Sequence, residues 1–178
     1  MPRQTRRDPW NHRLHGPLPR RLRRWLTSRD SLTARLRAHS RAFRVVLLFQ
    51  GWARPLPDEY PVLEIRPGNR AWVREVLLCD GDKPLVFAHS VLPAAGEHGP
   101  WNLFAGLGTR PLGEVLFTDP AISRHALRFK SLTARHPLFR RLSPYATAPR
   151  LEARRSLFHR SARSLLVTEV FLDPAALI

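Results

Sequence analysis

The chain is poor in cysteine and in acidic residues, and it contains no long apolar run. Cys79 is the only cysteine among 178 residues, so an intramolecular disulfide is excluded and the thiol cannot form a zinc site by itself. We expect a buried, unreactive thiol. No stretch approaches the roughly 18 apolar residues of a membrane-spanning helix. The first residues, MPRQTRRDPW, lack the apolar core of a signal peptide, so we expect a cytoplasmic location without membrane insertion.

Acidic residues number 14 against 30 basic ones, which gives a formal net charge of +16. The positive charge is concentrated in residues 1–44 and 131–163, whereas residues 45–130 hold equal numbers of basic and acidic groups. Arginine supplies 28 of the basic residues, a uniform bias that resembles codon preference. This distribution, without a glycine-rich or aromatic RNA motif, argues against a nucleic-acid-binding protein. Weak contact with an anionic surface remains open.

The length suits one domain with its own core, and no internal repeat is visible. Residues 1–19 combine four prolines with several arginines and few aliphatic residues. We therefore expect a flexible basic segment over 1–19 and a single monomeric domain over 20–178.

The stretch Ala71–Pro93 predicts a β-hairpin that carries one arginine on an apolar face. Alternation puts Arg74 on the same side as several large apolar residues, and the letters Asp80-Gly81-Asp82-Lys83 fit a tight turn. If Asp80 faces Lys83, the register puts His89 opposite Arg74. A guanidinium removed from water needs an anionic partner, either from the protein or from a ligand.

The remaining elements follow from periodicity and from helix-start signals. Strands are expected at 43–52, 121–130, 154–158 and 164–174, and a loop with one helical turn at 131–149. A first helix is expected from residue 20, with Leu22, Trp25 and Leu26 at helical spacing, and further helices at 31–40, 101–106 and 111–117. Asp30 or Ser31 would cap the second helix, and Pro111 would open the fourth. Amides at such helix starts can bind an anion, although water and the cap also satisfy them.

The last predicted strand carries one carboxylate, Glu169, on a face that it shares with Leu165, Val167 and Phe171. Glu169 and Arg74 can pair with each other as a structural ion pair. Alternatively, they line a closed apolar pocket with one cation and one carboxylate, which suits a small anionic ring compound.

Four blocks of the sequence resemble the chorismate lyase family: DSLTARL at 30–36, WVREVLLCDGDKPLVFAHSVLP at 72–93, LGTRPLGEVLFT at 107–118, and RRS at 154–156 with LLVTEVFLDP at 165–174. The resemblance covers roughly residues 20–178. It implies a single α+β domain, with an antiparallel sheet of about six strands, helices packed over it and an occluded ligand site. It also implies cleavage of chorismate to 4-hydroxybenzoate and pyruvate, without metal or organic cofactor, as the first committed step of ubiquinone biosynthesis.

The resemblance assigns roles to four positions. Arg74 matches the arginine that holds the ring carboxylate, and Leu32 matches a residue whose backbone amide assists it. Leu112 matches a backbone contact near the product hydroxyl, and Glu169 matches the carboxylate at the same end of the ring. Arg74 and Glu169 are thus the expected catalytic residues, with Glu169 either carrying a proton or orienting the C4 hydroxyl.

At one position the chain departs from the family pattern, because His89 stands where a second arginine is expected. His89 either binds the enolpyruvyl carboxylate of chorismate as a donor or is a neutral strand histidine bonded to a backbone carbonyl. Arg155 is the expected substitute for the missing arginine.

A different class of function also fits this fold, namely a non-catalytic domain that senses small aromatic acids. It resembles the effector-binding domains of bacterial transcription regulators, which normally follow a DNA-binding helix-turn-helix domain. Only about twenty residues precede the first predicted helix, so we expect no such domain here.

Overall fold

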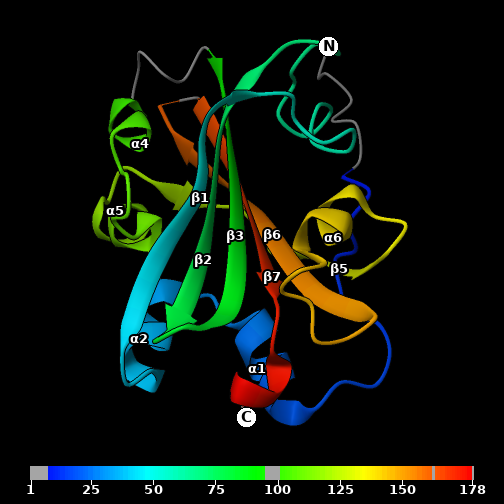
Figure 1. Ribbon diagram of the computed structural model, residues 1–178. Helices are drawn as coiled ribbons and strands as arrows, with labels where there is room; N and C mark the ends of the chain where they lie inside the picture. Colours follow the sequence, from blue (N-terminus) through cyan, green and yellow to red (C-terminus); the bar gives the residue numbers. More distant parts are fainter. Residues whose placement is uncertain (1–7, 95–100, 162, 178) are drawn as a thin grey trace.

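The computed structural model describes residues 8–94, 101–161 and 163–177, which form one antiparallel sheet covered by short helices (Figure 1). The strands are β1 (Phe43–Ala53), β2 (Ala71–Asp80), β3 (Lys83–Pro93), β4 (Ser123–Arg124), β5 (Arg128–Thr133), β6 (Arg150–Arg160) and β7 (Arg163–Phe171). Their order is β1-β2-β3-β7-β6-β4, with β5 also paired to β6. This arrangement confirms the predicted single α+β domain.

The described residues contain seven strands rather than about six, because the strand predicted at 121–130 is divided. Ser123–Arg124 pair with Phe158 and His159 of β6, and pairing resumes only where Arg128 faces Arg155. Residues 125–127 thus lie opposite only two residues of β6, so the ladder is interrupted. The strand β5 then extends to Thr133, into the predicted loop.

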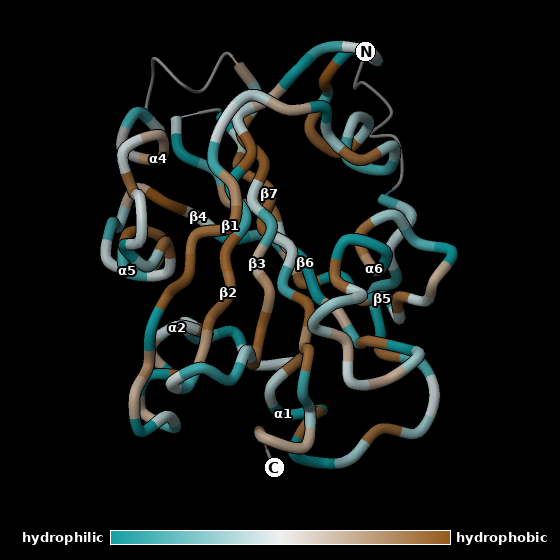
Figure 2. Tube along the Cα trace, viewed as in Figure 1, coloured by the Kyte–Doolittle hydropathy of each residue, from teal (hydrophilic) through white to brown (hydrophobic). Residues whose placement is uncertain are grey.

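Helices cover both faces of the sheet. They are α1 (Arg20–Thr27), α2 (Leu32–His39), α4 (Asn102–Ala105), α5 (Leu112–Thr118) and α6 (Pro137–Leu142), followed by the 3-10 helix η1 (Pro174–Leu177). One core joins α1 and α2 to the sheet face that carries Val76, and another joins α4 and α5 to the same face near Leu165. The opposite face packs against α6. Figure 2 shows the apolar residues concentrated along the central strands. No described helix is long and apolar enough to cross a membrane.

The helix starts predicted from the sequence are present. Ser31 caps α2, and its Oγ accepts a hydrogen bond from the amide of Ala34 at 3.2 Å. Pro111 precedes α5, whose first residue is Leu112. The predicted strand at 43–52 is also confirmed as β1.

The hairpin of β2 and β3 is present, but its predicted register is wrong beyond the turn. Asp80 faces Lys83 as expected, and Gly81 adopts a φ of 56° in the turn. One pair further, Cys79 faces Pro84, and then Leu78 faces Val86, which leaves Leu85 as an extra residue on β3. Proline cannot donate to the ladder, so a bulge at this position costs little hydrogen bonding. Because of this shift Arg74 pairs with Ser90, and the side chain of His89 lies on the other face of the sheet from that of Arg74.

The described part of the amino-terminal segment contacts the domain at Trp10 and Asn11. Trp10 is 3% exposed, and its Nε1 donates to Asp58 at 2.8 Å. The backbone of Asn11 exchanges two hydrogen bonds with Phe129 of β5. A single aromatic residue therefore anchors a segment whose composition predicts disorder, while residues 1–7 lie outside the described residues. The domain boundary at residue 20 stays a prediction.

Candidate functional site

Two neighbouring rows of side chains cross the sheet on the face that α2 and α5 cover. The first row contains Arg74 of β2, Ser90 of β3, Val167 of β7 and Ser156 of β6. The second contains Val76, Ala88, Glu169 and Arg154 on the same four strands. Because neighbouring strands lie about 4.8 Å apart, the first row spans about 14 Å from Arg74 to Ser156. All members of these rows except Arg154 line a cavity and form its floor.

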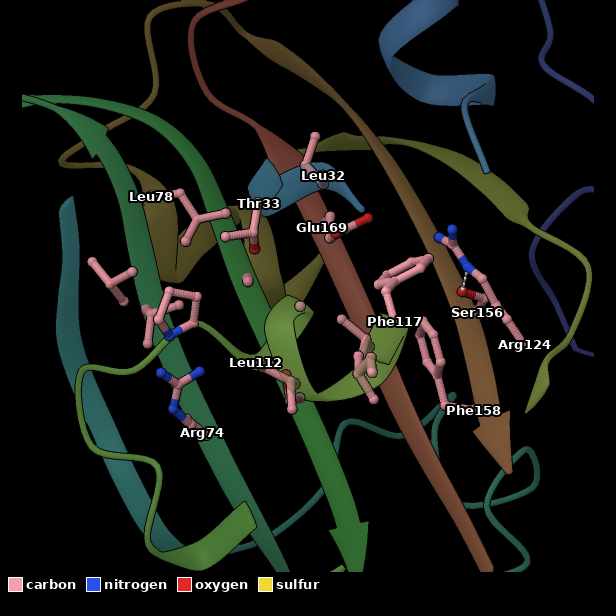
Figure 3. A pocket seen from close by; sticks show the side chains of 18 residues that line it. Leu32, Thr33, Arg74, Leu78, Leu112, Phe117, Arg124, Ser156, Phe158 and Glu169 are labelled. Atoms are coloured by element: carbon pink, nitrogen blue, oxygen red, sulfur yellow. Dashed lines mark hydrogen bonds between the residues drawn. The ribbon is translucent and has the colours of Figure 1, made fainter. Parts of the chain in front are cut away.

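The first turns of α2 and α5 cover the cavity (Figure 3). Leu32 and Thr33 come from α2, and Leu112 and Gly113 come from α5. A Cβ atom at Gly113 would lie 2.7 Å from the Oγ1 of Thr33. Glycine therefore permits the two helix starts to meet over the sheet.

Arg74 lines the cavity and is 2% exposed. Its Nη2 donates to the carbonyl oxygens of Gly108 and Arg110, both at 2.9 Å, and its Nε also donates to Gly108. No carboxylate among the described residues forms an ion pair with Arg74, so the alternative of an Arg74–Glu169 pair is wrong. Burial lowers the pKa of Arg74 to about 10, which keeps the guanidinium charged at neutral pH. The carbonyls fix the side chain and leave Nη1 for a ligand.

Glu169 lines the same cavity, and its partner is Arg154 of β6. The Nε of Arg154 lies 2.6 Å from the Oε2 of Glu169. Arg154 is fully buried, and its Nη1 donates to the carbonyl oxygens of Trp25, Leu26 and Ser28 at the end of α1. The position of Glu169 is thus held by the sheet, by Arg154 and through it by α1.

Leu32 and Leu112 are the first residues of α2 and α5, so neither amide has an acceptor within its own helix. Leu112 follows two residues after Arg110, whose carbonyl binds Arg74. In Figure 3, Leu112 lies toward Arg74 and Leu32 lies toward Glu169. The structure therefore brings four of the six predicted residues to one cavity.

His89 does not line the cavity. Its Nδ1 lies 2.9 Å from Glu75 and its Nε2 lies 3.1 Å from Glu59, on the opposite face of the sheet. Burial alone would lower the pKa of His89, but the two carboxylates outweigh it and raise this pKa to about 9. Glu75 also pairs with Arg141 at 2.6 Å. The predicted proximity to Arg74 is wrong, and His89 is neither neutral nor bonded to a carbonyl.

Arg155 also lies on that opposite face, because it pairs with Thr168 rather than with Val167. It forms ion pairs with Asp8 and Asp58, and its guanidinium lies 4.4 Å from the ring centroid of Trp10. The structure thus gives Arg155 two protein carboxylates and does not bring it to the cavity.

Arg124 is a charged cavity residue that the sequence did not indicate. It belongs to the two-residue strand β4, where no periodic pattern reveals its direction. Its Nε donates to the Oγ of Ser156 at 2.8 Å, and its Nη1 donates to the carbonyl of Arg29 at 2.9 Å. The cavity therefore has a second cation, on the far side from Arg74 (Figure 3).

Comparison with known proteins gives a consistent family. The family described as "Chorismate lyase" matches residues 12–177. A protein of Aromatoleum aromaticum named "Probable chorismate pyruvate-lyase" is 48% identical over 171 residues, which cover 93% of this chain and 92% of that protein. A protein of Thiobacillus denitrificans with the same name is 49% identical over 161 residues, covering 89% and 86%.

Solved structures share the fold at low sequence identity. The effector-binding domain of the Bacillus subtilis trehalose repressor superposes with a TM-score of 0.55 at 6% identity, covering 72% of this chain and 90% of that domain. The C-terminal domain of a histidine utilization repressor from Pseudomonas syringae gives 0.54 at 11% identity, covering 73% and 91%. At such identities the likeness concerns the fold alone.

Proposed function

The chain belongs to the chorismate lyase family and converts chorismate to 4-hydroxybenzoate and pyruvate for ubiquinone biosynthesis, and we propose that this reaction takes place in the cavity beneath α2 and α5. The observation that carries the proposal is a buried arginine without a carboxylate partner among the described residues, in an otherwise apolar part of the cavity. A buried cation of this kind requires an anion, and the substrate supplies one.

Arg74 holds the ring carboxylate. The carbonyls of Gly108 and Arg110 occupy Nε and Nη2, so Nη1 faces the ligand. The amide of Leu112, at the start of its helix, lies near the same end of the cavity and donates a second hydrogen bond to the carboxylate. In this assignment the amide of Leu112, rather than that of Leu32 as the family resemblance suggested, assists Arg74 in binding the ring carboxylate.

Glu169 accepts a hydrogen bond from the C4 hydroxyl at the other end of the ring, near the start of α2 with Leu32. Its contact with Arg154 at 2.6 Å fixes the position of the side chain, so the group acts as an acceptor and an orienting residue. Proton transfer by Glu169 would instead require it to bind and release a proton during turnover.

The chemistry is an elimination that makes the ring aromatic. The bond between C3 and the ether oxygen breaks, and its electron pair leaves with the enolpyruvyl group. C4 loses its hydrogen as a proton, the C4 hydroxyl is retained, and the methylene carbon of the pyruvate enolate gains a proton, so that the elimination consumes and releases no proton overall. The protein has to hold the dianion in the eliminating conformation and stabilise the charge on the departing oxygen.

The direct test is to incubate the purified protein with chorismate and to measure both products. We expect 4-hydroxybenzoate and pyruvate in equal amounts. Tight binding of 4-hydroxybenzoate without any turnover would instead support the aromatic-acid sensing domain.

Three further properties stay predictions: a monomeric state, a cytoplasmic location and a weak contact of the basic residues 1–44 with anionic surfaces. Sedimentation of the protein with anionic liposomes, compared with neutral ones, tests the last of these.

A further inference from the structure

We propose that Arg124 binds the enolpyruvyl carboxylate of chorismate and thereby selects the substrate over the aromatic product. The inference rests on the proposed function of the cavity. Chorismate carries two carboxylates, whereas 4-hydroxybenzoate carries only the one assigned to Arg74. A site that binds chorismate therefore needs a second cation, and neither His89 nor Arg155 reaches the cavity.

The geometry gives Arg124 the required position. Its hydrogen bond to Ser156 puts the guanidinium at the end of the row that begins with Arg74, across four strands. Glu169 and Arg124 both line the cavity, away from Arg74 (Figure 3). C3 of chorismate is the ring neighbour of C4. With the C4 hydroxyl at Glu169, the C3 substituent points toward Arg124.

Arg124 is also prepared for an anion. Its guanidinium lies 5.5 Å from the ring centroid of Phe117 and 5.3 Å from that of Phe158, and these two rings pack edge to face against each other. No carboxylate among the described residues forms an ion pair with it. Its hydrogen bonds to Ser156 and Arg29 use Nε and Nη1, which leaves Nη2 for a ligand. Burial lowers the pKa of Arg124 to about 10, so the group still carries its charge at neutral pH.

The same contact assists the reaction. When the bond from C3 to the ether oxygen breaks, the electron pair moves onto the enolpyruvate, which is bound through its carboxylate. A fixed guanidinium beside that group stabilises the developing negative charge. Arg124 then releases pyruvate, while Arg74 keeps its hold on the aromatic product.

The test compares one ligand that has the second carboxylate with one that lacks it. For Arg124→Met we expect the KM for chorismate to rise roughly ten- to hundred-fold, since one charge-assisted contact is lost. The Kd of 4-hydroxybenzoate should stay within about twofold of wild type. An inert analogue, 3-(carboxymethoxy)-4-hydroxybenzoate, should lose affinity in the variant as chorismate does.

Arg29→Ala is the matched control, because the exposed Arg29 offers only its backbone carbonyl to Arg124. It removes a nearby charge, and the KM for chorismate and the Kd of 4-hydroxybenzoate should both stay within about twofold of wild type. An unchanged KM in Arg124→Met, or an equal loss of affinity for both aromatic acids, would overturn the proposal. If Arg124→Met does not fold, Arg124→Lys should give an intermediate KM with unchanged binding of 4-hydroxybenzoate. Absence of turnover in the wild type would contradict the proposed function instead, and the two aromatic acids would still test Arg124 by titration.

Discussion

Two buried arginines on opposite faces of the sheet, Arg155 and Arg74, are in opposite electrostatic states, whereas buried Arg154, on the same face as Arg74, is paired with Glu169. On the face toward α6, Arg155 has the carboxylates of Asp8 and Asp58, and His89 lies between Glu59 and Glu75. On the cavity face, Arg74 and Arg124 have only carbonyl and hydroxyl acceptors among the described residues. Successive residues along each strand point to the two faces in turn.

The contrast shows that a buried charge does not by itself mark a binding site. A buried charge that is neutralised by protein carboxylates, such as Arg155, has a structural role. A charge that is held in place by neutral acceptors but lacks a counter-ion is complete only with a ligand. Glu169 lies between these states, because its pair with Arg154 leaves one oxygen, Oε1, for the substrate.

The largest effect should come from removing the anchor on the cavity face. For Arg74→Met we expect the Kd of 4-hydroxybenzoate to rise about a hundred-fold or more and most turnover to be lost, since the charged hydrogen bond to the ring carboxylate disappears. Calorimetric titration measures the Kd. Near-normal affinity would remove the anchor role, and Arg155→Met on the other face is the matched control with wild-type affinity.

A smaller effect on turnover should separate the two roles of Glu169. Glu169→Gln keeps an oxygen that accepts from the C4 hydroxyl and from Arg154, so we expect kcat to fall by less than about tenfold. Glu169→Ala removes the acceptor, so its kcat should fall much further. If the Gln variant loses as much as the Ala variant, Glu169 transfers a proton. Both are compared by single-turnover kinetics.

On the face toward α6 the expected effect is on stability. Arg155→Met leaves Asp8 and Asp58 without their cation, which should lower the free energy of unfolding by about 3 kcal/mol. Urea denaturation measures this loss, and the KM for chorismate should change less than about twofold. A large change in KM would mean that the two faces are coupled.

The smallest effect is a pH dependence confined to that same face. Because the pKa of His89 is raised to about 9, its contribution to stability is complete below about pH 6.5 and is lost as the pH rises toward 9. We expect a loss of roughly 1 to 2 kcal/mol between pH 6.5 and 8. Thermal unfolding should show it in the wild type and not in His89→Gln, while ligand affinity stays constant over this window.

Local patterns in the sequence determined much of the molecule. The alternation in β2 and β7 put Arg74 and Glu169 on apolar faces, and the cap at Ser31 together with Pro111 located the two helix starts. These features depend on residues close in the chain, where the periods of strands and helices leave few choices. The family resemblance then assigned Arg74, Glu169 and the two helix starts to a single ligand.

Only the tertiary structure decided which charges meet. A single bulged residue, Leu85, places His89 on the other face. The alternation of apolar and polar residues does not predict where a bulge occurs. Arg155 pairs with Asp8 and Asp58, which lie about a hundred or more positions away in the sequence. Arg124 reached the cavity from a two-residue strand through Ser156. Pairing between charges depends on distances across the sheet, which the order of residues does not contain.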